Sequence, residues 1–218
     1  MKSIFLIVTI ILLMGCYHPS ISTDSFIPPA NVRKVVVTLI DSLGAFTMYI
    51  PERYDTSFAW IHYSDTKSCD KIKCRFQPKI LPINMENGWF WRVPLDSVDC
   101  LTIIYSPHFM VQTVDTTWVS SVGKSFQEKM KVRGTETDII LDTLYKIYDR
   151  PFAVSATSRY IPQLHRQCYK LTAVTSVRMM DITFEFELIT EKKDTIGTDF
   201  MKKEMDLLQT IKFTKEPW

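Results

Sequence analysis

The sequence predicts an α+β fold, in which a mostly antiparallel β-sheet packs two or three helices on one face. Apolar and polar residues alternate in several short segments, most clearly in residues 182–188, and this period of two is typical of strands with one buried face. Two other segments space their apolar residues as an amphipathic helix does. The order is strands, a helix, strands and a terminal helix, which favours the α+β class.

The predicted strands are rich in β-branched and aromatic residues, and they cover residues 35–40, 45–50, 57–63, 89–93, 98–105, 168–177 and 182–188. The first is apolar on both faces, which predicts an interior strand. The third places Phe58, Trp60 and His62 on one side. The fourth follows an Asn-Gly pair, which is a strong hairpin signal. The last two are expected to pair in antiparallel fashion.

Helices are predicted at residues 135–148 and 198–210. The first begins with a threonine and an aspartate in capping-box spacing, and Pro151 is expected to end it. The second begins with a threonine and an aspartate at the positive end of the helix dipole. A third segment, residues 121–132, fits a helix or a strand, and we favour the helix. The layout loosely resembles the small sandwich folds of the PsbP/Mog1 type, although no motif carries the likeness.

The composition excludes several classes of function. The 26 basic and 24 acidic residues give a net charge of +2, which argues against a nucleic-acid partner. The six glycines never occur at the close spacing of a phosphate-binding or dinucleotide-binding loop. The HExxH and GxSxG motifs are absent as well. We therefore expect no nucleic acid and no cofactor.

The first sixteen residues resemble the signal peptide and lipobox of bacterial lipoproteins. Lys2 gives a positive start, and residues 3–14 form an apolar stretch of about 18 Å as a helix, against roughly 30 Å of bilayer hydrocarbon. The run Leu-Met-Gly-Cys at 13–16 then follows the lipobox order, with methionine where a small or β-branched residue is more usual. The resemblance implies that a lipid is attached to Cys16 and that the chain is cut after Gly15. The alternative is an ordinary secretory signal or an uncleaved anchor, with Cys16 incidental.

This resemblance sets the expected organisation of the chain. Residues 1–15 are a cleaved signal peptide, residues 16–31 are the lipid attachment and a flexible tether, and residues 32–218 are a single globular α+β domain. The tether contains three prolines and three serines and reaches roughly 50 Å when extended. Tyr17 stands where the related inner-membrane lipoproteins carry an aspartate. We therefore expect an envelope protein anchored by its lipid in the outer membrane and facing the periplasm.

Four further cysteines, in even number, are typical of two disulfides in an exported domain; they are Cys69, Cys74, Cys100 and Cys168. A local Cys69–Cys74 pair would leave Cys100 to pair with Cys168, and the alternative is buried free thiols. The spacing of Cys69 and Cys74 does not suit zinc, and we expect no metal site.

Aromatic and basic side chains are the candidates for a binding surface, namely Trp60, Trp89, Trp91, Lys71, Lys73 and Arg75. Tryptophans offer large rigid contact areas for a sugar or peptide, and the cations suit anionic headgroups or glycans. The alternatives are core packing for the tryptophans and a solvated face for the cations.

The absence of catalytic motifs favours a lipid-anchored envelope protein with a non-catalytic binding, accessory or assembly role, whose partner is a protein or a small ligand. The first alternative is an envelope hydrolase whose catalytic residues form no linear motif. That alternative requires a pocket that gathers His62, His108 or His165 with a carboxylate and a nucleophile. The second alternative is a purely structural or stress-related lipoprotein.

The lipobox leads to a first testable prediction. A clickable fatty acid fed to the producing bacterium should label the protein, and the Cys16→Ala variant should carry no label because it lacks the acceptor thiol. Intact-mass measurement gives an independent check. A parent protein without label or added lipid mass contradicts the anchor.

Overall fold

The structure is a computed structural model, and it describes residues 30–40, 44–63, 70–85, 97–105, 137–148, 150–177, 180–191 and 195–214. The side chains of residues 195–198 are not described. Within these ranges the chain forms two antiparallel sheets and one helix, α3 (Thr195–Leu208).

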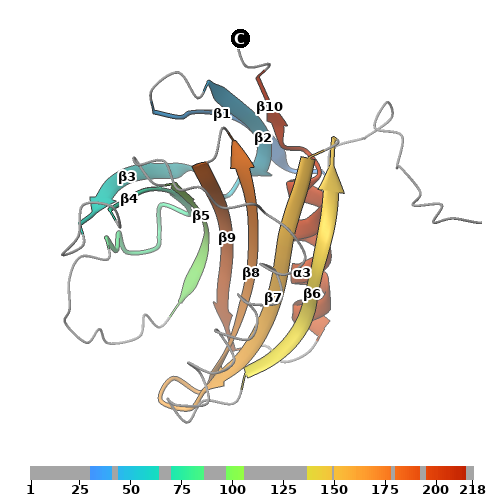
Figure 1. The fold of residues 1–218 in the computed structure, drawn as a ribbon. Coiled ribbons are helices and arrows are strands. Elements are labelled where there is room, and N and C mark those ends of the chain that lie inside the picture. The colour runs from blue at the N-terminus through green and yellow to red at the C-terminus, as the bar shows by residue number, and fades with distance from the viewer. Residues whose placement is uncertain are drawn as a thin grey trace, which may run out of the picture.

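The larger sheet has seven strands in the order β3-β4-β5-β9-β8-β7-β6, so most neighbours are joined as hairpins along the chain. Its strands are β3 (Thr56–His62), β4 (Lys71–Gln77), β5 (Val98–Tyr105), β6 (Thr137–Ile147), β7 (Arg150–Ile161), β8 (Arg166–Val177) and β9 (Met180–Thr190). The smaller sheet has the order β1-β2-β10 and consists of β1 (Val32–Thr38), β2 (Ala45–Pro51) and β10 (Lys212–Phe213). Figure 1 shows the large sheet as a curved layer, with the small sheet and α3 on one side.

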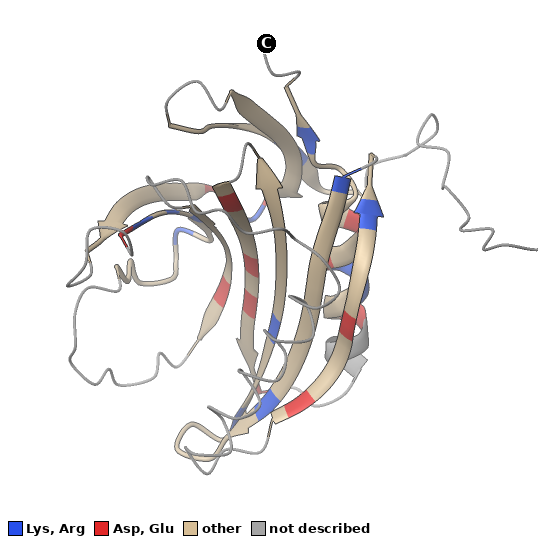
Figure 2. Cartoon of the chain, viewed as in Figure 1, with Lys and Arg blue, Asp and Glu red and all other residues tan. Residues whose placement is uncertain are grey.

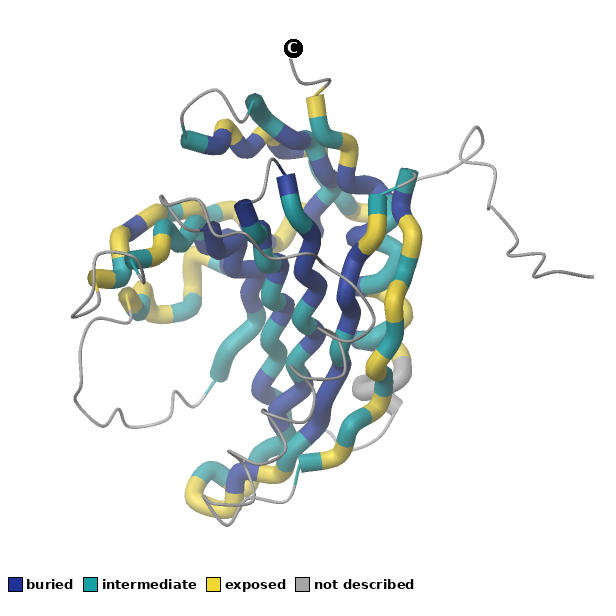
Figure 3. Tube along the Cα trace, viewed as in Figure 1, coloured by how far each residue is buried: buried dark blue, intermediate teal, exposed yellow. Residues whose placement is uncertain are grey.

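The core lies between the large sheet on one side and the small sheet with α3 on the other. Phe46 of β2 meets Phe184 of β9 edge to face, with 5.3 Å between ring centroids, and both side chains are fully buried. The ring centroids of Phe200 on α3 and Tyr169 on β8 lie 6.1 Å apart, with the two rings tilted relative to each other. Alternation along the strands therefore sends one set of side chains into this core, while β6 and the β3–β4 end of the sheet carry most of the exposed strand residues (Figure 3).

The predicted α+β class with two or three helices is wrong, because the described residues are mostly antiparallel strand with one helix. The terminal helix is confirmed as α3, whereas residues 135–148, predicted as a helix, form β6. Its isoleucines, threonines and Tyr145 pair with β7, and this pairing overrides the helical spacing of the apolar residues. The candidate helix at 121–132 lies outside the described residues.

The strand predictions differ in outcome. Predicted strands 45–50, 57–63, 98–105, 168–177 and 182–188 are confirmed, and the last two pair as expected. The first strand is a sheet edge and not an interior strand: Val35 and Val37 are buried, but Val36 is 66% exposed. Strands β4, β7 and the short β10 were not predicted, and the predicted strand 89–93 lies outside the described residues.

A carboxyl group occupies a core position of α3. Glu204 is 2% exposed, and its Oε2 has no hydrogen-bond partner in the part of the chain described. Burial raises the pKa of Glu204 to about 8; Arg53 opposes this shift and Asp99 adds to it. Asp99 itself accepts hydrogen bonds from Arg53 Nε (2.7 Å) and Tyr54 Oη (2.7 Å). Folding therefore favours the neutral form of Glu204.

This raised pKa predicts how stability depends on pH. The folded pKa of about 8 exceeds the ordinary value of 4.5. The contribution of Glu204 to the stability of the fold is therefore fully present below pH 4.5, and it is lost as the pH rises towards 8. The Glu204→Gln variant, which stays neutral, should gain stability relative to the parent by a few kcal/mol over this range in urea unfolding. Asp199→Asn, at an exposed position of the same helix, is the matched control for net charge. A pH-independent difference between parent and Glu204→Gln contradicts the account.

Candidate binding site

The pairing of β3 with β4 gathers four predicted binding residues on one face of the large sheet. In the register, Phe58 lies opposite Arg75, Trp60 opposite Lys73 and His62 opposite Lys71, so all six side chains share a face. We call this set the β3–β4 polar surface. It lies on the face opposite the core, near one edge of the sheet, and Figure 2 shows Lys and Arg positions on this pair. Trp89 and Trp91, also predicted to bind, lie outside the described residues.

Arg75 is the organising residue of this surface and is only 7% exposed. Its Nε donates a hydrogen bond to Thr102 Oγ1 of β5 (2.9 Å), and an Nη donates to the backbone oxygen of Asn84 (3.0 Å). Its guanidinium lies 5.1 Å from the centroid of the Trp60 ring, within cation–π range. The buried charge is thus held by an aromatic face and by two oxygen acceptors.

Trp60 is 8% exposed and stacks on Phe58, with ring centroids 5.5 Å apart. The Nζ of Lys73 lies 5.8 Å from the centroid of its ring. The indole Nε1, however, finds no acceptor among the described residues. A buried donor without a partner costs on the order of 1–3 kcal/mol, so this surface has a donor in excess.

The polar character continues across the centre of the same face. Thr102 lies opposite Glu185 of β9, and the Glu185 Oε2 is 3.1 Å from Lys170 Nζ of β8. Burial alone would lower the pKa of Lys170, but the carboxylates of Glu185 and Glu187 outweigh it and raise that pKa. Lys170 therefore stays charged, which suits an ion pair and not a nucleophile.

The structure does not join Cys100 to Cys168. Cys100 and Cys168 are buried free thiols on β5 and β8, and β9 runs between these strands. Two strand spacings separate their backbones by about 10 Å, which exceeds the reach of a disulfide. Cys74 is also free and points to the opposite face, while Cys69 and Cys16 lie outside the described residues.

These thiols are poor candidates for a nucleophile or a metal ligand. Burial raises the pKa of Cys100 to about 12 and the pKa of Cys168 to about 11, so both remain protonated at neutral pH. The Cys168 Sγ donates to Glu187 Oε1 at 3.8 Å. Within the described ranges, three or more metal-ligating side chains never gather.

The histidines of the hydrolase hypothesis do not come together in the described part of the chain. His62 lies on β3, at one edge of the large sheet, whereas His165 lies in the turn between β7 and β8, where its Nδ1 is 3.2 Å from Tyr160 Oη. His108 lies outside the described residues.

No protein-family model matches the chain, and its sequence matches no curated protein. It is similar in structure to the cyanobacterial PsbP protein (CyanoP) from Synechocystis sp. PCC 6803, at 14% identity and a TM-score of 0.48, over 89% of this chain and 99% of that one. It is also similar to PA94, a protein of unknown function from Pseudomonas aeruginosa, at 9% identity and a TM-score of 0.36, over 85% and 99% of the two chains. At these scores neither likeness carries an argument about function.

Proposed function

We propose that the chain is a lipid-anchored, non-catalytic binding protein of the bacterial cell envelope, and that its β3–β4 polar surface holds an anionic group of its ligand. One observation carries the binding part: the indole N–H of Trp60, which finds no acceptor among the described residues, lies beside the cations Lys73 and Arg75. The surface thus sets an N–H donor beside cations, and a carboxylate or phosphate group supplies both an acceptor and the opposite charge.

The composition of the surface supports an anion over a neutral ligand. Its six members include Lys71, Lys73 and Arg75 but no acidic residue. Lys71 is exposed, while Lys73 is half-buried and Arg75 is buried. An approaching anion would therefore meet the solvated Lys71 first and the desolvated Arg75 next. The electrostatic attraction between the anion and the cation is stronger at the desolvated position.

The lipid anchor is supported by the first sixteen residues, which lie outside the described residues. In the part of the chain that the structure describes, no helix has the length and apolar character needed to cross a membrane. The tether between Cys16 and β1 would keep the binding surface close to the envelope membrane while the domain turns freely.

The hydrolase alternative finds less support in the described residues. The buried thiols are protonated, Lys170 is ion-paired, and His62 and His165 lie on well-separated elements. A nucleophile with an adjacent base, which hydrolysis without a metal needs, is not assembled among them.

The proposal predicts a selective change at Trp60 when an anion binds. We expect inorganic phosphate or glucuronate to shift one indole N–H signal of the detergent-solubilised protein in a ¹H–¹⁵N spectrum, because the bound oxygen accepts that proton. The Trp60→Phe variant identifies the signal, since it alone should lack it. Arg75→Gln should weaken the response to both probes.

Lys34→Gln, which removes an exposed cation from β1, is the matched control and should respond as the parent does. The binding proposal fails if the Trp60 signal stays fixed with both anions, or if Lys34→Gln weakens the response as much as Arg75→Gln. A uniform drift of all indole signals would show non-specific screening and would also count against it.

A further inference from the structure

We propose that residues 78–85, which we call the apolar loop, form a membrane-contacting element that rests the domain on the bilayer to which it is tethered. The loop follows β4 directly, and Arg75 of the β3–β4 polar surface contacts its backbone at Asn84. The inference goes beyond ligand binding and rests only on the anchoring part of the proposed function.

The apolar loop is held in a defined shape. Leu81 donates its N–H to the oxygen of Pro78 (3.1 Å), which closes a turn. The Gln77 side chain, 4% exposed, donates Nε2 to the backbone oxygens of Leu81 (3.1 Å) and Pro82 (3.2 Å). Arg75 donates to Asn84 as described above. Two buried side chains of β4 thus fix the backbone of the loop.

This fixed loop presents large apolar side chains to the surroundings. Ile80 is 92% exposed, Ile83 is 60% exposed and Met85 is 47% exposed. Single exposed apolar residues are common, but three within six residues of one ordered loop form a concentrated apolar surface. The neighbouring Lys79 is exposed as well and suits the headgroup region.

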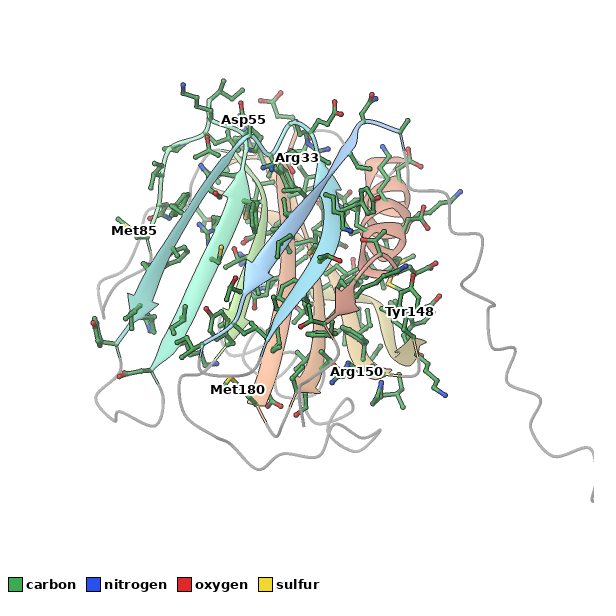
Figure 4. All side chains as sticks on the ribbon, turned by 90° about the horizontal axis from the view of Figure 1, so that it is seen from above. Arg33, Asp55, Met85, Tyr148, Arg150 and Met180 are labelled. Atoms are coloured by element: carbon green, nitrogen blue, oxygen red, sulfur yellow. The ribbon has the colours of Figure 1, made fainter. Side chains whose placement is uncertain are left out.

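The tether leaves the domain at the same end. The oxygen of Asn31, the residue before β1, accepts a hydrogen bond from the N–H of Glu52 (2.9 Å) in the turn after β2. Three residues later, Asp55 Oδ1 accepts the N–H of Lys79 at the start of the apolar loop (2.6 Å). Figure 4 shows Arg33 and Asp55 together at one end of the molecule, opposite Arg150 and Met180. The tether therefore joins the domain at the end that carries the apolar loop.

A bilayer fits this arrangement better than a free protein partner does. The anchor would keep the loop at the bilayer surface at a high effective concentration, so even weak insertion of Ile80 and Ile83 would be populated. The loop also lies at the end of the domain where the tether joins β1, so a tethered domain can bring it to the bilayer.

The test uses the full chain purified from the producing bacterium and reconstituted into vesicles of phosphatidylethanolamine and phosphatidylglycerol. The vesicles contain a lipid with a photoactivatable group near the headgroup end of its acyl chain, and adducts are mapped by mass spectrometry. We expect adducts concentrated in residues 78–85, and their loss in the double variant Ile80→Ser, Ile83→Ser. Ile140→Ser with Leu144→Ser, two residues of β6 that are each 42% exposed, is the matched control and should keep the loop adducts.

Equal labelling of the loop and of β6, or a loop without adducts, would overturn the inference. A loop that binds a protein partner instead of the bilayer would give no lipid adducts. Thermal unfolding of both double variants checks that the domain is intact. Because the substituted positions are exposed, the melting temperature should stay close to that of the parent. Intact mass separates the two proposals: an acylated protein with an unlabelled loop overturns this inference alone, whereas an unacylated protein overturns the anchor together with the geometry built on it.

Discussion

The buried guanidinium of Arg75 is the constraint on which this account of the molecule depends. A charge removed from water must find compensation, and Arg75 finds it in three segments far apart in sequence: the Trp60 ring on β3, Thr102 on β5 and the backbone of Asn84. The same contacts align the cations of the polar surface and fix the apolar loop. One side chain therefore couples the proposed anion site to the proposed membrane contact.

Much of the fold follows from local pattern. Strand 182–188 alternates cleanly because one face meets the core and the other meets polar side chains, and α3 follows from its helical spacing. Residues 71–77 also alternate cleanly between basic and apolar side chains. The possible Cys69–Cys74 disulfide, however, favoured a loop at these positions over the strand β4. Residues 137–147 carry helical spacing of apolar side chains, yet pairing with β7 decides their conformation. Pairing between strands is a long-range effect that a local pattern does not contain.

The candidate site was predictable in its residue types but not in its assembly. The aromatic side of β3 and the basic run of β4 were visible in the sequence, and the register places them on one face. Thr102 and Asn84 gave no signal, because each acts through a contact with Arg75 that only the folded chain creates. Glu204 was hidden for a different reason: a glutamate on a helix is ordinarily solvated, and the buried stripe of α3 passes through it.

The most direct test of the central claim is amide hydrogen exchange in the Arg75→Lys variant. Lysine keeps the charge but loses the planar fork that reaches Thr102 and Asn84 together. The account predicts faster exchange confined to residues 78–85 and to β3, with the β8–β9 amides as protected as in the parent. Unchanged exchange in the loop, or a uniform loss of protection across the large sheet, would contradict the role given to Arg75.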